Sequence, residues 1–301
     1  ATTDIYTLSL HDALPISVLA GGIRRSAMIA FFDVNDTDML TAKTGMWWEN
    51  NPQRGRANNS VILDRKVITN EVFNEIWEKT KRSKAGEPGF YFTNDKTMGS
   101  NPCVEIGLQP YQMCNLVEIN GMAITNQRDF NEAASAAALI ATLQAGFTDF
   151  HFLRDIWRTT TEKEALLGVS ITGIANKNLL ALDFKEAAGY VKSVNRKIAD
   201  IIGIEPAARQ TAVKPAGTTS LVLGTSSGIH AYHNDYYIRR VQIAKNEALY
   251  TYLSINHPEL VEDYHENPTK IATIVVPQKA PDGAIIRTES AISLLDRKSV
   301  V

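Results

Sequence analysis

The chain has 301 residues, of which 44% are hydrophobic and 21% are charged, a composition typical of a globular protein with a sizeable core. A formal net charge of −2 gives no sign of a nucleic-acid-binding surface, and no apolar run reaches the roughly 18 residues of a membrane-spanning helix. We therefore expect neither nucleic acid nor a membrane as a partner. Two cysteines and no recognisable signal peptide predict a protein of the reducing cytoplasm.

The two ends of the chain read as translated adapter DNA. A DNA sequence that encodes residues 10–16 contains, on its opposite strand, the codons for residues 296–301 followed by a stop. One DNA sequence therefore accounts for both ends, and it resembles a common short-read sequencing adapter. We expect residues 1–17 and 296–301 to be foreign, and residues 18–295 to be an internal fragment of a longer protein.

The first part of residues 18–295 predicts three strands and a helix. Short apolar segments are typical of buried strands, and three occur here: residues 25–34, 60–64 and 89–94. Between the last two, residues 70–83 repeat apolar side chains at helical spacing, on a face made of Val72, Phe73, Ile76 and Trp77.

The second part predicts two long helices and another strand. An alanine-rich run at 129–147 starts with an aspartate, as helices often do, and residues 184–203 place apolar side chains at steps of three and four. Residues 271–277 are expected to form a buried strand. Alternating strands and helices predict an α/β fold with mainly parallel pairing, and the lack of a linker predicts one domain.

The two cysteines, Cys103 and Cys114, lie close together in the sequence. They could form a disulfide, contribute to a metal site, pack as core thiols or do chemistry. A zinc site would need closer spacing and two more ligands, so we predict no metal here. A disulfide in a reducing compartment would be catalytic or regulatory rather than structural.

Asn101 and Glu105 flank Cys103 at two-residue intervals, and Pro102 makes a helix unfavourable. In an extended segment, alternate residues project to the same side, so an amide, a thiol and a carboxylate would converge. Such a group can hydrogen-bond a substrate, react through sulfur and take up a proton. The alternative is a buried, unreactive cysteine beside a surface glutamate.

A second candidate site is the loop at 213–233, which is rich in small and hydroxyl-bearing residues. Its backbone N–H groups, with the hydroxyls of Thr218, Thr219 and Ser220, could hold phosphate oxygens. The spacing is not that of a Walker A loop, because Lys214 precedes Gly217. A plain loop with no ligand is the alternative.

Taken together, these stretches resemble the catalytic chains of ribonucleotide reductases, and in particular the class II, adenosylcobalamin-dependent enzymes. The segment NPCVEI is similar to the active-site finger loop of that family, CNLVEIN to the strand that follows it, and KPAGTTS to the substrate-phosphate loop. AGGIRRSAMIAFFD and NPQRGRANNSVILD also match in the family's order. The resemblance covers essentially all of residues 18–295.

The resemblance implies a ten-stranded α/β barrel made of two five-stranded parallel halves, with the finger loop at its centre. It implies reduction of ribonucleoside di- or triphosphates to 2′-deoxyribonucleotides by a thiyl-radical mechanism. Adenosylcobalamin would be the cofactor, and an external dithiol such as a thioredoxin-like protein would be the reductant. Nucleotide effectors and a monomer or homodimer are further implications.

The resemblance also implies roles for individual residues. Cys103 would carry the thiyl radical that takes the ribose 3′-hydrogen, Glu105 would take the 3′-hydroxyl proton, and Asn101 would hydrogen-bond the sugar hydroxyls. Cys114 would be one of two thiols that reduce C2′, and its partner should lie upstream of this fragment. We therefore expect the 301-residue chain to be inactive. The expected phosphate ligands are Ala216, Gly217, Thr218, Thr219 and Ser220.

Other assignments remain open. A class I large subunit would use a separate metal-containing radical subunit, although the short interval between the cysteines favours class II. Class III is less consistent with the carboxylate of Glu105. A phosphate-ligand binding module with incidental thiols is an alternative of another kind. A thiol–disulfide oxidoreductase would need a lowered pKa at Cys114, of which the sequence gives no sign.

Overall fold

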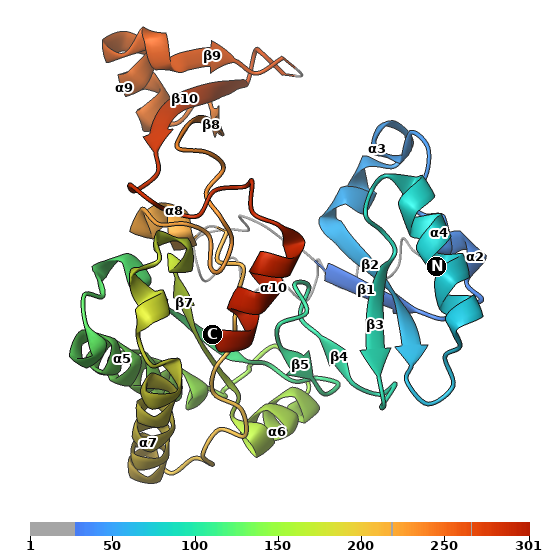
Figure 1. Cartoon of the computed structure of the whole chain (residues 1–301), viewed down its shortest axis with the longest axis vertical. Helices are drawn as coiled ribbons and strands as arrows, with labels where there is room; N and C mark the ends of the chain where they lie inside the picture. Colours follow the sequence, from blue (N-terminus) through green and yellow to red (C-terminus); the bar gives the residue numbers. More distant parts are fainter. Residues whose placement is uncertain (1–27, 218, 266) are drawn as a thin grey trace. The chain divides into compact units, whose positions relative to one another are not determined.

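The computed structural model describes residues 28–217, 219–265 and 267–301 (Figure 1). These residues divide into two compact units, each assembled from several stretches of chain. Unit 1 contains the described residues up to Val117, together with Asn131–Ser170 and Glu186–Lys214, and unit 2 contains the rest. The chain passes between the two units several times, so no single linker separates them, and one domain stays the prediction from the sequence.

Unit 1 begins with a parallel sheet in the order β1-β2-β3. Its strands are β1 (Met28–Phe32), β2 (Ala57–Asp64) and β3 (Gly89–Thr93), in parallel register from Met28 opposite Ala57 and from Ser60 opposite Gly89. The three strands expected in this part of the chain are confirmed, with residues 25–27 of the first lying outside the described residues.

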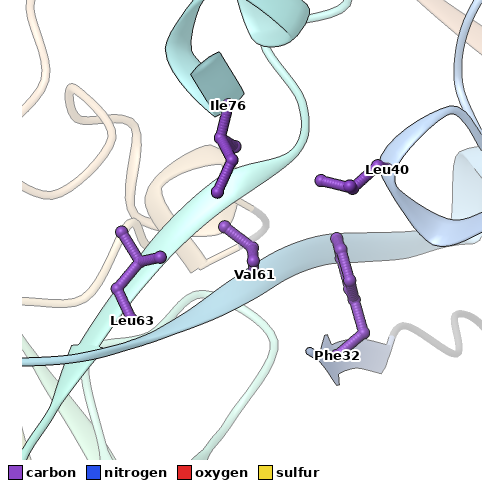
Figure 2. Close-up of a cluster of buried hydrophobic side chains, with 5 residues drawn as sticks. All are labelled: Phe32, Leu40, Val61, Leu63 and Ile76. Atoms are coloured by element: carbon purple, nitrogen blue, oxygen red, sulfur yellow. The ribbon is translucent and has the colours of Figure 1, made fainter. Parts of the chain in front are cut away.

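The helix predicted at residues 70–83 is confirmed as α4 (Asn70–Ser83), and it packs against this sheet. Thr69 caps its first turn by accepting the N–H of Val72. In Figure 2, Ile76 of α4 and Val61 of β2 point toward one another within a buried cluster. Ile76 is 2% exposed, whereas Trp77 is 42% exposed, so the buried stripe of the helix is narrower than the predicted face. The cluster comprises Phe32, Leu40, Val61, Leu63 and Ile76.

The rest of unit 1 consists mainly of helices and two short strand pairs. The predicted helices at 129–147 and 184–203 are confirmed as α5 (Gln127–Ala145) and α7 (Phe184–Ile202). Asn195 of α7 donates to the Thr142 hydroxyl of α5 across 2.9 Å, and both side chains are buried. The remaining helices and strands, some of which extend into unit 2, are α2 (Thr37–Leu40), α3 (Trp47–Asn50), β4 (Gly99–Ser100), β5 (Gly107–Leu108), β6 (Asn115–Asn120), α6 (Asp155–Glu164) and β7 (Leu167–Thr172).

Unit 2 contains an antiparallel sheet in the order β8-β10-β9. The strand predicted at 271–277 is confirmed as β10 (Ile271–Lys279), but its antiparallel pairing differs from the mainly parallel arrangement expected. Antiparallel strands need no long crossover connection, so alternation of strands and helices alone does not predict their direction. The other elements are α8 (Thr219–Leu223), β8 (Tyr236–Ala244), α9 (Ala248–Asn256), β9 (Val261–Asp263) and α10 (Ala291–Val300).

Short 3-10 helices connect several elements: η1 (Pro52–Arg56), η2 (Gly121–Ala123), η3 (Ile174–Asn176), η4 (Asn178–Ala181) and η5 (Pro258–Leu260). Helix α10 runs into the segment 296–301, which we expected to be adapter-derived, and buries Arg297 beside Glu289. Residues 1–17 lie outside the described part of the chain.

The architecture is mixed α/β, as expected, but the strands of the described residues form small separate sheets of two or three strands. The ten-stranded barrel is not seen among them. No helix in the described residues is long and apolar enough to cross a bilayer.

Candidate active site

Residues 101–106 form a closed hairpin loop between β4 and β5, whose strands pair with Ser100 opposite Gly107. The N–H of Asn101 donates to the Ile106 carbonyl at 3.2 Å, and the N–H of Ile106 donates to Asn101 Oδ1 at 3.0 Å. The extended geometry that we expected here is therefore wrong. Asparagine and proline are favoured at the first two positions of a tight turn as well as in extended segments, so the same two residues are consistent with the observed hairpin.

The tip of this loop is tightly turned. The N–H of Val104 donates to the Asn101 carbonyl at 3.0 Å, and Val104 has a φ of +67°. A β-branched residue in the left-handed region is strained, and such strain persists only where the surroundings hold it. One such restraint is Asn58 of β2, whose side-chain amide donates to the Pro102 carbonyl. Cys103, at the tip, is exposed to solvent.

Glu105 lies at the base of the loop, and its side chain is only 7% exposed. Its Oε1 atom accepts a hydrogen bond from Lys214 Nζ at 3.2 Å. Its Oε2 atom is buried and has no hydrogen-bond partner among the described residues. Glu105 therefore presents one neutralised oxygen and one oxygen that is available to a bound group.

Cys114 immediately precedes β6 and is partly buried. Gly168 lies beside the thiol: a Cβ atom there would be in ordinary contact with Cys114 Sγ at 3.5 Å, but it would clash with Leu116 at 2.4 Å. Burial raises the pKa of Cys114 to about 11, and Glu105 adds to this rise, whereas Arg209 and Lys214 oppose it. The thiol is therefore protonated at neutral pH, which is the opposite of what a thiol–disulfide oxidoreductase needs.

A carboxylate clamp holds the segment that leads to Cys114. Glu164 at the end of α6 accepts hydrogen bonds from Gln109 and Gln112, both at 2.8 Å. Arg209 completes the clamp through a 2.9 Å ion pair with Glu164. These contacts join residues 45 to 55 positions apart, so no local sequence pattern predicted them.

The predicted active-site residues of unit 1 occupy one region. Asn101, Cys103 and Glu105 share the hairpin loop, and Cys114 is close enough to Glu105 and Lys214 for their charges to affect its pKa. No disulfide joins the two cysteines. Sequence reasoning missed Lys214, because it lies 109 positions from its carboxylate partner.

The predicted phosphate loop belongs to unit 2, where Thr218 lies outside the described residues. Gly217 and Thr219 are exposed, and Thr219 is the first residue of α8. Ala216 and Ser220 are buried, and the Ser220 hydroxyl donates to the Gly217 carbonyl at 3.3 Å. The Ser220 hydroxyl is therefore used in a hydrogen bond within the loop. Across the described residues, no three His, Cys, Asp or Glu side chains are grouped to hold a metal ion.

No protein-family model matches the chain. It is similar to an adenosylcobalamin-dependent ribonucleoside-triphosphate reductase of Euglena gracilis, with 28% identity over 99% of this chain and 42% of the relative. It is also similar to a probable adenosylcobalamin-dependent ribonucleoside-triphosphate reductase of Dictyostelium discoideum, with 27% identity over 97% of this chain and 40% of the relative.

Solved structures share the fold. A B12-dependent, class II ribonucleotide reductase matches 84% of this chain with a TM-score of 0.64 and 21% identity, over 40% of its own length. The alpha subunit of a class Id reductase from Actinobacillus ureae matches 73% of this chain, with a TM-score of 0.50 and 15% identity. The chain is thus a homologue of the class II, adenosylcobalamin-dependent ribonucleotide reductases, and it spans about 40% of the length of these relatives.

Proposed function

We propose that this chain is the part of a class II ribonucleotide reductase that converts ribonucleotides to 2′-deoxyribonucleotides. The observation that carries the proposal is the loop with an exposed thiol, Cys103, and a buried carboxylate, Glu105, whose Oε2 atom has no partner among the described residues. A reachable sulfur and a proton acceptor are the two groups that thiyl chemistry on a ribose requires. The names of the relatives favour ribonucleoside triphosphates as substrates.

In this proposal the sulfur radical of Cys103 takes the 3′-hydrogen and becomes a thiol, and Glu105 Oε2 takes the 3′-hydroxyl proton. The 2′-hydroxyl then takes a proton from one of two thiols and leaves as water, and the two thiols form a disulfide as they supply two electrons and a second proton to C2′. Glu105 returns its proton to the 3′-oxygen, and Cys103 finally returns a hydrogen atom to C3′ and becomes the sulfur radical again. Asn101 uses Oδ1 to close the loop, so we assign its Nδ2 donor to the sugar hydroxyls.

Cys114 is proposed to be one of the two reducing thiols. Its raised pKa keeps it as S–H at neutral pH, which is the form that carries a hydrogen. The chain holds only Cys103 and Cys114, so the partner thiol must come from elsewhere in the longer protein. A dithiol such as a thioredoxin-like protein would reduce the disulfide again. The 301-residue chain alone is therefore expected to be inactive.

The loop from Ala216 to Ser220 is proposed to bind the substrate phosphates. Gly217 is exposed, and a Cβ atom added to it would meet nothing within 4 Å, so a ligand can approach the backbone closely. Successive backbone N–H groups in such a loop bind anionic oxygens. The buried Ser220 hydroxyl supports the loop through its bond to the Gly217 carbonyl.

Adenosylcobalamin is the proposed cofactor, because the relatives in Euglena and Dictyostelium are named for it. The exposed side chain of Cys103 fits this group, since a bulky cofactor can reach the sulfur only at such a tip. When bound, the cofactor supplies the radical that Cys103 carries. We further propose that this chain contributes to a ten-stranded barrel with the finger loop at its centre, which the fold similarity to the class II structure supports.

The test uses the full-length reductase that contains this sequence, supplied with adenosylcobalamin, a ribonucleoside triphosphate and a dithiol. Cys103→Ser is expected to abolish deoxynucleotide formation while nucleotide binding persists. Deoxynucleotide formation by the Cys103→Ser protein would overturn the proposal. Binding without any reduction by the unchanged full-length protein would instead favour a phosphate-ligand binding module.

A further inference from the structure

We propose that Lys214 is a positioning residue, which holds Glu105 so that Oε2 rather than Oε1 takes the substrate proton. This inference rests on the proposed function and deepens it, because it assigns a role to a residue outside the hairpin loop. It begins from the contact between Lys214 Nζ and Glu105 Oε1, at 3.2 Å.

The contact is sheltered from solvent. The side chains of Lys214 and Glu105 are 18% and 7% exposed, so water screens their attraction less than on an open surface. A buried carboxylate is costly unless it is paired, and Lys214 is the cation that pairs with it in the described part of the chain. Because one oxygen is occupied, the buried and partnerless Oε2 is the atom left to act on a substrate.

The backbone of Lys214 is anchored to a neighbouring strand. Its N–H donates to Ser170 Oγ at 3.1 Å, and Ser170 is a buried residue of β7. Pro215 follows, and a proline restricts the residue before it to extended geometry. The ammonium group therefore reaches Glu105 from a backbone anchored on a strand, which is a firmer support than the strained loop can give its own carboxylate.

Replacing Lys214 by a neutral side chain would leave both oxygens of Glu105 without a partner. The carboxylate would then be free to rotate, and the base would no longer be fixed toward the ribose. Lys214→Met keeps the length of the side chain and removes the charge, whereas Lys214→Arg keeps the charge with a different geometry. Lys43 offers a matched control, since its 2.8 Å ion pair with Glu87 is similarly buried, with exposures of 8% and 18%.

The first experiment tests the geometry in the 301-residue chain, without any turnover. Cys114 responds to both charges, because Lys214 lowers and Glu105 raises the pKa of its thiol. In a Cys103→Ser background, Lys214→Met should move the pH midpoint of Cys114 alkylation upward, and Glu105→Gln should move it downward. Lys43→Met should leave the midpoint unchanged. An unchanged midpoint in folded Lys214→Met protein would show that Lys214 does not lie at this site.

The second experiment measures turnover in the full-length reductase. Lys214→Met should lower kcat about 10- to 100-fold, the range expected when a catalytic group is displaced by about 1 Å. KM for the nucleotide should stay nearly constant, because Lys214 touches the base rather than the substrate. Lys214→Arg should recover part of kcat, and Lys43→Met should retain it.

The outcomes separate this inference from the proposed function. If Cys103→Ser keeps its activity, the proposed function fails whatever Lys214 does. If Cys103→Ser is inactive but Lys214→Met has the same kcat as the unsubstituted reductase, only the positioning role fails. If Lys214→Met does not fold, Lys214→Arg decides: a folded arginine variant with a kcat below that of the unchanged protein supports the role, and one with an equal kcat contradicts it.

Discussion

Asn101 Oδ1 accepts the N–H of Ile106 at 3.0 Å, so the residue proposed to bind the ribose also closes the loop that carries Cys103 and Glu105. The proposed binding role and the observed loop contact use different atoms of Asn101: the carbonyl oxygen supports the loop, and the amide nitrogen is the donor proposed to bind the ribose. A substitution that changes one of these atoms and keeps the other can separate the two roles.

Asn101→Asp is such a substitution, because aspartate keeps the acceptor and loses the Nδ2 donor. In the 301-residue chain, the Ile106 amide should keep its protection from hydrogen exchange in Asn101→Asp and lose it in Asn101→Ala. In the full-length reductase, both variants should lose activity. Full activity in Asn101→Asp would contradict the role assigned to the amide nitrogen.

Val104→Gly should remove the cost of placing a β-branched residue at a φ of +67°. That conformation costs roughly 1–2 kcal/mol for an L-residue, which offsets the entropy that glycine loses on folding. Val67 is the control, since it is exposed and has no positive φ. Urea unfolding should therefore show a smaller loss of stability for Val104→Gly than for Val67→Gly, and equal losses would show that Val104 is not strained.

The Cys114 thiol should make the stability of the chain depend on pH above 9. Its pKa rises from 9.0 to about 11 on folding, so between these values the native state keeps a proton that the unfolded state has lost. The free energy of unfolding should therefore fall as pH rises through this window, by on the order of 2 kcal/mol relative to Cys114→Ala. Denaturant unfolding at pH 8.5 and pH 11 would measure this, and parallel profiles for the two proteins would contradict it.

Gly121 should tolerate alanine poorly. An added Cβ atom would lie 2.6 Å from the Thr172 carbonyl oxygen and 2.4 Å from Leu179, and the backbone oxygen cannot move aside easily. We expect Gly121→Ala to lower the free energy of unfolding by about 1–3 kcal/mol. Gly189 of α7 is the control, because its Cβ position is empty within 4 Å and alanine should stabilise that helix by up to about 1 kcal/mol. Thermal unfolding of both variants would compare them.

Elements with a strong local pattern could be predicted from the sequence. Helix α4 has the predicted bounds, and α5 and α7 lie within two residues of theirs, because periodic apolar side chains and end signals agree in these segments. The hairpin at Asn101 could not be distinguished from an extended segment, since asparagine and proline suit both. The pairing of Glu105 with Lys214 depends on tertiary structure, and no local pattern carries it.

The contacts of Glu164 make substitutions at several positions depend on one another. The Glu164 carboxylate accepts hydrogen bonds from three partners on two segments, so loss of the acid would leave all three donors without their acceptor. Changes at these sites should be tolerated together rather than singly. In an alignment of homologues we therefore expect four columns to covary: Gln109, Gln112, Glu164 and Arg209.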